Sequence, residues 1–387
     1  MAATRLPLDV EREILLRLPA RSLRRVKYVC KSWNSIITDV NFLAAYRRRH
    51  VSNSGFMLLR HHARPLSGGE PNIYFSLSDE SFVERDQFCV PLLEEEEFKS
   101  ILHAEPSFNQ ILSPNRVELV GSSINGLYCI LISVGKRYEP MSSCNLYLWN
   151  PSIGKSKCVL QSDYNPNINF YLGFGYHEQM DDYKIVKISY PISGRFGDVE
   201  VFSLKTNSWR RKIVGNGGGS LSNMLWATST STFVNGACHW GVYTRENKAR
   251  FCILAYDLHG NTCQRLVPPE NCVDGRELRF SSLWVYMGLL SISVLHFGGF
   301  DSATSTHDIW VMTDYAAVHS WAKVLTIDLD GGPRRPVLMG RNGEVLMLGD
   351  GDDDHVIYEP QKEEQVKSLG IIDVEAIAPY MESLVLL

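Results

Sequence analysis

The sequence predicts a multidomain α + β protein, with a small helical domain over residues 1–50 and an all-β domain over residues 51–387. Two observations lead to this prediction. Apolar residues recur at helical spacing in the first fifty residues. The rest of the chain repeats a short strand and a polar turn at an interval of roughly fifty residues. A length of 387 residues also agrees with two domains.

The first helix is predicted from Val10, Ile14 and Leu18, which share one helical face because they are spaced by four residues. Pro19 ends this helix, since proline has no backbone N–H to donate. Three more short helices follow. The second carries Leu23, Val26 and Cys30, and the third carries Trp33, Ile36 and Ile37. The fourth carries Phe42 and Tyr46, and Asp39 can cap it.

These helices carry more apolar residues than one face can hold. Leu15 lies about 100° from Ile14 around the helix and widens the apolar stripe toward a second surface. Val29 does the same beside Cys30. The second surface can serve to dock a partner or to pack onto the following domain, and the spacing alone leaves both interpretations open.

Five short elements in this order and spacing resemble an F-box over residues 5 to 46: Leu6-Pro7, Ile14-Leu15, Leu18-Pro19, Ser22-Leu23 and the run from Val29 to Trp33. The resemblance implies docking onto a Skp-type adaptor and, through it, onto the cullin and RING subunits of a ubiquitin ligase. The apolar anchors that it implies are Pro7, Leu8, Ile14, Leu15, Leu18, Pro19, Leu23, Val29, Cys30 and Trp33.

Charge also separates the two parts of the chain. Residues 1–50 carry 11 Lys or Arg against 4 Asp or Glu, a net charge of +7, while the whole chain carries −4. The basic segment would therefore attract an acidic partner. An acidic adaptor protein fits this charge, and so does a nucleic acid bound by a helix-turn-helix, although no second basic stripe supports the latter.

Composition limits the remaining classes. Hydrophobic residues make up 44% and charged residues 21%, which is ordinary for a soluble globular protein. No apolar run predicts a membrane span or a signal peptide. The nine cysteines are scattered without a Cys-x-x-Cys pair, which indicates reduced thiols and a cytoplasmic or nuclear location.

The strand-and-turn repeat occurs six times after the helices. The six copies begin at Ile73, Leu146, Val199, Ile253, Ile309 and Val356. A second marker has the same period: the Asn-Gly pairs ending at Gly126, Gly236 and Gly343 predict tight type I′ hairpins, and Met287-Gly288 occupies an equivalent position.

Each repeat then holds about four strands, which is typical of a β-propeller blade. Six blades can close a ring, and Met381–Leu387 could supply the strand that completes the first blade. Stacking as a sandwich is the alternative.

This region also resembles a known family. The segments that carry the resemblance include residues 121–127, 148–154, 173–176, 201–209, 234–240 and 308–312. They are similar to the F-box-associated, kelch-like domain that accompanies F-boxes mainly in plants, including the S-locus F-box proteins of pollen. The resemblance implies a six-bladed propeller that presents a protein target.

Catalytic and cofactor motifs are not found. The sequence has no Gly-x-Ser-x-Gly, Walker or His-Glu-x-x-His pattern. Residues 61–62, 217–219 and 350–354 are predicted to be loops, since none has metal-ligand or phosphate-loop spacing. Cys30 is predicted to be a small buried hydrophobe. We expect a substrate-recognition subunit without cofactor, catalytic residues, nucleic acid or membrane partner; the alternative is a propeller that binds a protein or acts as an enzyme outside ubiquitination.

Overall fold

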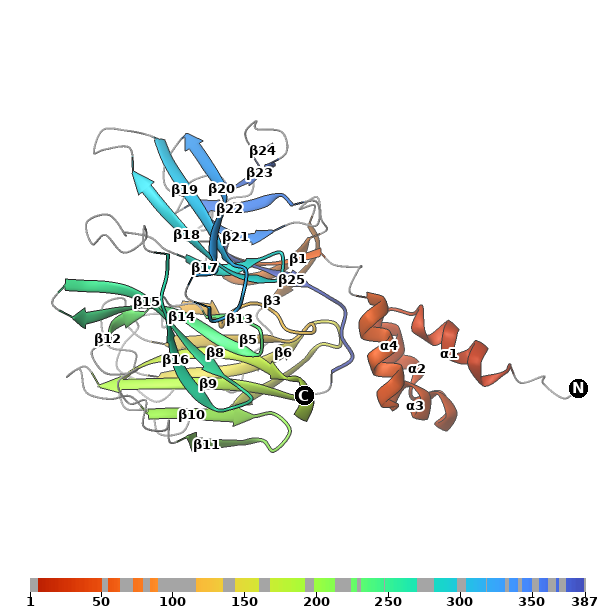
Figure 1. Cartoon of the computed structure of the whole chain (residues 1–387). Helices are drawn as coiled ribbons and strands as arrows, with labels where there is room; N and C mark the ends of the chain where they lie inside the picture. The colour runs from red at the N-terminus through yellow and green to blue at the C-terminus, as the bar shows by residue number, and fades with distance from the viewer. Residues whose placement is uncertain are drawn as a thin grey trace, which may run out of the picture.

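The computed structural model describes residues 6–50, 55–62, 72–78, 84–89, 116–134, 143–159, 168–191, 198–212, 224–227, 231–246, 248–269, 282–297, 304–317, 319–330, 334–339, 343–349, 355–360, 367–368 and 374–385. Four α-helices precede six antiparallel sheets. The helices stand beside one face of the sheet domain (Figure 1). Within the described part, no helix is long and apolar enough to cross a membrane.

The helices are α1 (Leu8–Leu16), α2 (Ala20–Val26), α3 (Lys31–Thr38) and α4 (Val40–His50). Pro7 and Pro19 directly precede α1 and α2 with φ of −54° and −58°, angles that proline adopts without strain. The predicted cap of the fourth helix is present: the Asp39 carboxylate accepts from the backbone N–H groups of Asn41 and Phe42, both at 3.0 Å.

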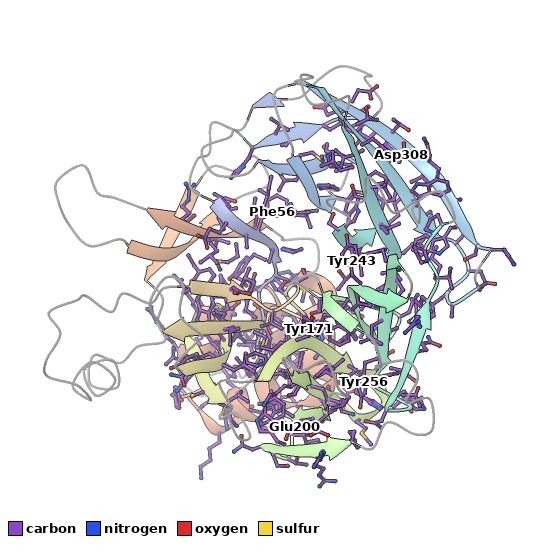
Figure 2. The ribbon with its side chains drawn as sticks, turned by 90° about the vertical axis from the view of Figure 1, so that its left-hand side faces the viewer. Phe56, Tyr171, Glu200, Tyr243, Tyr256 and Asp308 are labelled. Carbon is purple, nitrogen blue, oxygen red and sulfur yellow. The ribbon has the colours of Figure 1, made fainter. Side chains whose placement is uncertain are left out.

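The six sheets are the blades of a ring (Figure 2). Blade 1 holds β1 (Gly55–His62), β2 (Asn72–Ser78), β3 (Glu84–Cys89) and β25 (Val374–Tyr380). Blade 2 holds β4 (Arg116–Leu119), β5 (Tyr128–Val134), β6 (Ser143–Asn150) and β7 (Lys155–Val159). Blade 3 holds β8 (Ile168–His177), β9 (Asp182–Pro191), β10 (Asp198–Ser203) and β11 (Ser208–Lys212), with the short helix η1 (Glu178–Met180) between β8 and β9.

The other three blades complete the ring. Blade 4 holds β12 (Met224–Ala227), β13 (Thr232–Val234), β14 (Ala237–Glu246), β15 (Lys248–Asp257) and β16 (Thr262–Leu266). Blade 5 holds β17 (Ser282–Tyr286), β18 (Leu289–Phe297), β19 (Thr304–Met312) and β20 (Trp321–Asp330). Blade 6 holds β21 (Arg334–Met339), β22 (Val345–Gly349), β23 (Val356–Tyr358) and β24 (Lys367–Ser368).

The chain ends close the ring. β25 pairs antiparallel with β1, with Tyr380 opposite Gly55, so the first blade takes one strand from each end of the sheet domain. This confirms the six-bladed propeller over the sandwich. The prediction that Met381–Leu387 completes the first blade is wrong: the closing strand lies one segment earlier, where Val374 and Ala378 are buried, and residues 381–385 leave the sheet.

Both sequence repeats map onto equivalent places in the blades. The six copies of the strand repeat lie on the third strand of each sheet, counting β25 as the first of blade 1. Asn125 and Gly126 have φ of +52° and +76°, and Met287 and Gly288 have +49° and +78°, the positive pairs that a type I′ turn requires. These turns join the first and second strands of their blades.

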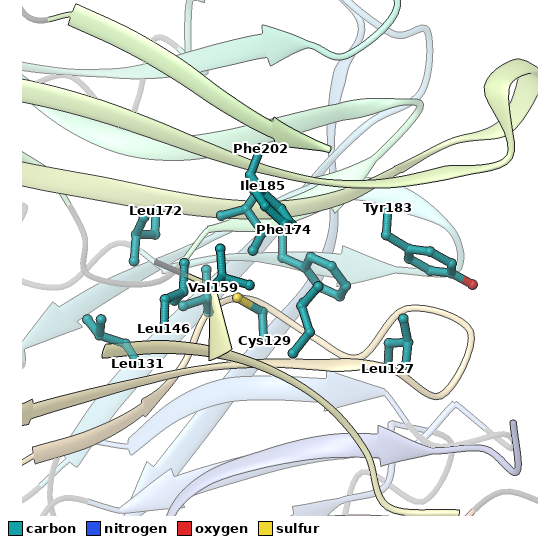
Figure 3. Packing of buried hydrophobic residues seen from close by; sticks show 12 residues of the cluster. Leu127, Cys129, Leu131, Leu146, Val159, Leu172, Phe174, Tyr183, Ile185 and Phe202 are labelled. Carbon is teal, nitrogen blue, oxygen red and sulfur yellow. The ribbon is translucent and has the colours of Figure 1, made fainter. Parts of the chain in front are cut away.

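The core of the propeller lies between neighbouring blades. Cys129 and Leu146 of blade 2 pack against Phe174 and Ile185 of blade 3, and all four are buried (Figure 3). Similar clusters join the other neighbours, except that no cluster of described residues joins blade 6 to blade 1. Apolar burial between sheets therefore holds the ring together and leaves the turns at its two faces for other contacts.

Candidate functional site

Exposed apolar side chains gather on the helical domain. Seven of the eleven large hydrophobic side chains that are exposed in the described chain lie there: Leu6, Leu8, Val10, Ile14, Tyr28, Val29 and Val40. Leu8 is 67% and Val29 68% exposed. Apolar side chains exposed one at a time are ordinary on a protein surface, whereas this short segment concentrates seven of them. We refer to these seven residues as the exposed helical patch.

The ten predicted anchors divide into three groups by exposure. Pro7, Leu8, Ile14, Pro19, Val29 and Cys30 are exposed, Leu18 and Trp33 are half-buried, and Leu15 and Leu23 are buried. Eight of the ten therefore present some surface to a partner. Cys30 is not the buried hydrophobe that the sequence predicts, because α2 ends at Val26 and Cys30 becomes the N-cap of α3.

Leu15 and Leu23 have a different role in the structure. They are 1% and 0% exposed and form the helical core with Phe42 and Tyr46 of α4. Buried side chains cannot contact a partner unless the domain rearranges, so their prediction as direct anchors is revised. They hold α1 and α2 against α4 and thereby support the exposed helical patch from behind.

The helices also pack onto the propeller. Ile153, in the turn after β6, is 4% exposed and belongs to the helical core. The Arg24 guanidinium of α2 donates to the Ile153 carbonyl, and the Arg47 guanidinium of α4 lies 5.7 Å from the centre of the Tyr176 ring. Both interpretations of the widened apolar stripe are thus compatible with the fold: one face covers the propeller and the other is exposed.

Residues 381–385 lie between the two parts, and we call them the C-terminal strap. Figure 1 shows the chain running from β25 between the ring and the helices. The Asn150 amide donates to the carbonyls of Ser383 and Val385 at 3.2 and 3.0 Å, which holds the strap on blade 2. On its other side, Leu384 packs against the helical core.

Glu382 of the strap lies against three groups of the helical domain and forms hydrogen bonds with two of them. Its carboxylate accepts from the backbone N–H of Ala20 at 3.1 Å and from the Tyr46 hydroxyl at 2.8 Å, and it lies 3.7 Å from Nδ1 of His50. Burial, followed by the Glu382 charge, raises the pKa of Tyr46 far above its usual range, so this hydroxyl stays protonated and donates. Sequence reasoning missed this contact, since nothing in the local pattern relates Glu382 to residues more than three hundred positions away.

A cavity of about 520 Å³, partly open to solvent, lies among the inner strands of the propeller. Its lining is mainly apolar, with Leu59, Leu119, Trp284 and Leu338 among the side chains, and also includes Glu118 and Glu375. In the described part of the chain, no three His, Cys, Asp or Glu residues converge as a metal site would require. The volume of the cavity is within the range of small-molecule pockets.

The ring buries His239, Cys129 and Cys238, three titratable side chains. His239 lies 3.1 Å by Nδ1 from the Thr232 carbonyl and 2.7 Å by Nε2 from the Tyr315 hydroxyl. Since a carbonyl can only accept, Nδ1 carries the proton and the neutral ring accepts from Tyr315. Burial lowers the pKa of His239 to about 4. Burial also raises the pKa of the Cys129 and Cys238 thiols, which keeps them from acting as nucleophiles.

The prediction that residues 61–62 form a loop is wrong: they are the last two residues of β1, where His61 and His62 pair with Ile73 and Asn72 of β2. Residues 217–219 and 350–354 lie outside the described residues.

Two family models match the chain. The F-box domain model matches residues 4–44, and the F-box associated beta propeller domain model matches residues 125–385. An F-box/kelch-repeat protein of Arabidopsis thaliana is 26% identical over 325 residues, covering 83% of this chain and 79% of the relative. An F-box protein of the same plant is 25% identical over 365 residues, covering 88% of this chain and 78% of the relative.

Solved structures resemble the fold at low sequence identity. A triple mutant of AofleA from Arthrobotrys oligospora aligns with a TM-score of 0.42 and 9% identity, covering 68% of this chain and 73% of that chain. An α-L-arabinanase from Penicillium chrysogenum also aligns with a TM-score of 0.42, at 10% identity over 65% of this chain and 80% of that chain.

Four helices joined to a closed six-bladed ring define a protein with a small helical domain and a β-propeller domain. The chain belongs to the plant F-box proteins that carry an F-box-associated, kelch-like β-propeller domain.

Proposed function

We propose that this protein is the substrate-recognition subunit of an SCF-type ubiquitin ligase in the cytoplasm or nucleus. Residues 1–50 dock a Skp-type adaptor, and through it the cullin and RING subunits, while residues 51–387 bind a protein target. The observation that carries the proposal is the exposed helical patch within the segment that matches the F-box model. In this role the protein is not itself an enzyme: it raises the effective concentration of target lysines near the conjugating enzyme.

Covering the exposed helical patch on docking would be favourable. Fully burying a Leu or Val side chain stabilises by about 1.5–3 kcal/mol, so covering the two-thirds of Leu8 or Val29 that is exposed contributes about 1–2 kcal/mol each. The net charge of +7 on residues 1–50 would speed association with an acidic adaptor. Pro7, Ile14, Pro19 and Cys30 add exposed surface, and Leu18 and Trp33 add partly exposed surface.

Adaptor binding by the full chain tests this proposal. We would titrate a purified Skp-type adaptor against the unaltered chain, the double variant Leu8→Asp/Val29→Asp, and the control Met287→Asp. Met287 is a matched control because it is an apolar side chain 69% exposed, on a turn of blade 5. We expect the double variant to bind about 100-fold more weakly or worse, and the control to stay within about twofold of the unaltered chain.

Failure of the unaltered chain to bind the adaptor would contradict the proposal. Steeply salt-dependent binding of DNA or RNA would then favour a nucleic-acid site on the basic helices. Equal loss of binding in the double variant and in Met287→Asp would place the adaptor contact somewhere other than the exposed helical patch.

A further inference from the structure

The C-terminal strap contacts the helical domain and the propeller at the same time, and the two sets of contacts differ in kind. On the propeller side, the hydrogen bonds involve the backbone of the strap. The Asn150 amide donates to the Ser383 and Val385 carbonyls, and the Ser383 N–H donates to the Ser152 hydroxyl at 3.0 Å. On the helical side the bonds go to one side chain, Glu382. The strap is therefore attached firmly to the ring, with Glu382 directed at the helices.

The three groups that meet Glu382 come from different parts of the helical domain. Ala20 is the first residue of α2, and Tyr46 and His50 lie one turn apart on α4, with ring centres 4.1 Å apart. The oxygen of the Tyr46 hydroxyl, whose one proton goes to Glu382, also lies 3.2 Å from the Leu18 carbonyl oxygen. Nε2 of His50 lies 3.1 Å from the Leu16 carbonyl, so the end of α1 belongs to the same arrangement. The Glu382 carboxylate thus contacts α2 and α4 directly. Tyr46 and His50, which lie next to it, in turn approach the carbonyls at the end of α1.

The donors at this site are shielded from water, so leaving them without an acceptor would be costly. Tyr46 is 1% exposed, His50 is buried, and the Glu382 side chain is 25% exposed. A charged acceptor with buried donors forms stronger hydrogen bonds than neutral pairs. Removing the carboxylate would leave the Ala20 N–H and the Tyr46 hydroxyl with one acceptor fewer at a buried interface.

We propose that Glu382 is a positioning residue that fixes the orientation of the helical domain on the propeller, and with it the placement of a bound target relative to the ligase. The inference rests on the proposed function for its meaning in ubiquitin transfer, but the orientation itself does not depend on that function. Since the exposed helical patch is on the helical domain and the target-binding part is the ring, any swivel between them moves the target relative to the adaptor.

The test measures this orientation directly in the full chain. Spin labels are introduced as non-natural amino acids at the exposed residues Asn41 on α4 and Met287 on blade 5, and the distance distribution between them is recorded. We expect a narrow distribution for the unaltered chain and a clearly broader one for Glu382→Ala. Glu382→Gln should stay narrow, because its amide oxygen still accepts from Ala20 and Tyr46. Asp314→Ala, which removes an exposed carboxylate from the turn after β19 of blade 5, should change nothing.

Adaptor affinity is measured on the same variants and separates the two proposals. We expect all of them to bind within about twofold of the unaltered chain, since Glu382 is not part of the exposed helical patch. In the assembled ligase, mapping of the ubiquitin that is transferred to the propeller's own lysines should give more modified positions for Glu382→Ala than for Glu382→Gln. A narrow distance distribution in a folded Glu382→Ala variant overturns the positioning role, whereas absent adaptor binding by every variant overturns only the proposed function.

Discussion

The turn at Gly126 offers a test of the strap that needs no partner protein. An added Cβ at Gly126 would overlap the Met381 carbonyl oxygen and lie 2.5 Å from Cβ of Ser383, so Gly126→Ala must displace the strap or the turn. Gly236 is the equivalent turn residue of blade 4, with φ of +73° against +76° at Gly126, and a Cβ there would have no heavy atom within 4 Å. Both alanine variants therefore carry the cost of placing alanine at a positive φ, but only Gly126→Ala also places a Cβ too close to the strap.

The size of each effect follows from these two terms. Alanine in the left-handed region costs about 1–2 kcal/mol, which is the full expected loss for Gly236→Ala. Overpacking a filled site costs about 1–3 kcal/mol more, so Gly126→Ala should lose about 2–5 kcal/mol of unfolding free energy. Urea unfolding followed by tryptophan fluorescence measures both variants. Hydrogen exchange at the Ala20 amide, the donor to Glu382, should rise in Gly126→Ala and not in Gly236→Ala.

Equal destabilisation of the two variants, with unchanged exchange at Ala20, would refute this reasoning. It would mean that the strap moves away from the turn without loss and does not couple the helices to the ring. A loss in Gly236→Ala as large as the one expected at Gly126 would refute the assignment of open space around the blade 4 turn.

Two further predictions concern the cores of the two domains. Leu23→Ala should destabilise the helical domain by about 2–5 kcal/mol, because Leu23 is fully buried. Val29→Ala should leave the thermal unfolding of the helical domain almost unchanged, because Val29 is exposed. Thermal unfolding followed by circular dichroism compares the two variants. His239 has a folded-state pKa of about 4, below the ordinary value of 6.5, so the unfolded chain binds its proton first and stability falls as pH drops from about 6.5 toward 4. Between pH 7.5 and 5 the unaltered chain should lose about 2 kcal/mol more unfolding free energy than His239→Gln. Urea titration at each pH measures this difference. Parallel pH profiles of the two proteins would contradict a lowered pKa of His239 in the folded state.

Features with a short period could be predicted from the sequence. The helical spacing around Ile14, the Asp39 cap and the Asn125-Gly126 turn each depend on residues within a few positions of one another, and the structure contains all three. The six-bladed ring followed from the same kind of signal, because each blade repeats its own local turn chemistry. A four-stranded unit that repeats six times leaves few arrangements other than a ring of six blades.

Exposure within the helical domain could not be predicted in the same way. Ile14 and Leu15 are adjacent and equally apolar, yet Ile14 is exposed and Leu15 is buried against α4. Which face is covered depends on the position of α4 and of the propeller turn at Ile153, and neither is encoded in the spacing of α1 itself. Cys30 was misjudged for a related reason, since the second helix ends four residues before it.

The geometry of the chain explains why a strap is needed. Gly55 at the start of β1 pairs with Tyr380 at the end of β25, so the helices and the strap both join the ring at one edge of blade 1. Attachment at a single edge leaves a domain free to swivel about that edge. The strap then crosses to Asn150 on blade 2, and the contact between Arg47 and Tyr176 adds a point on blade 3. Contacts on three successive blades resist rotation about the blade 1 edge. Glu382 adds to this resistance by joining the strap to α2 and α4, beside the direct contacts of Arg24 with Ile153 and of Arg47 with Tyr176.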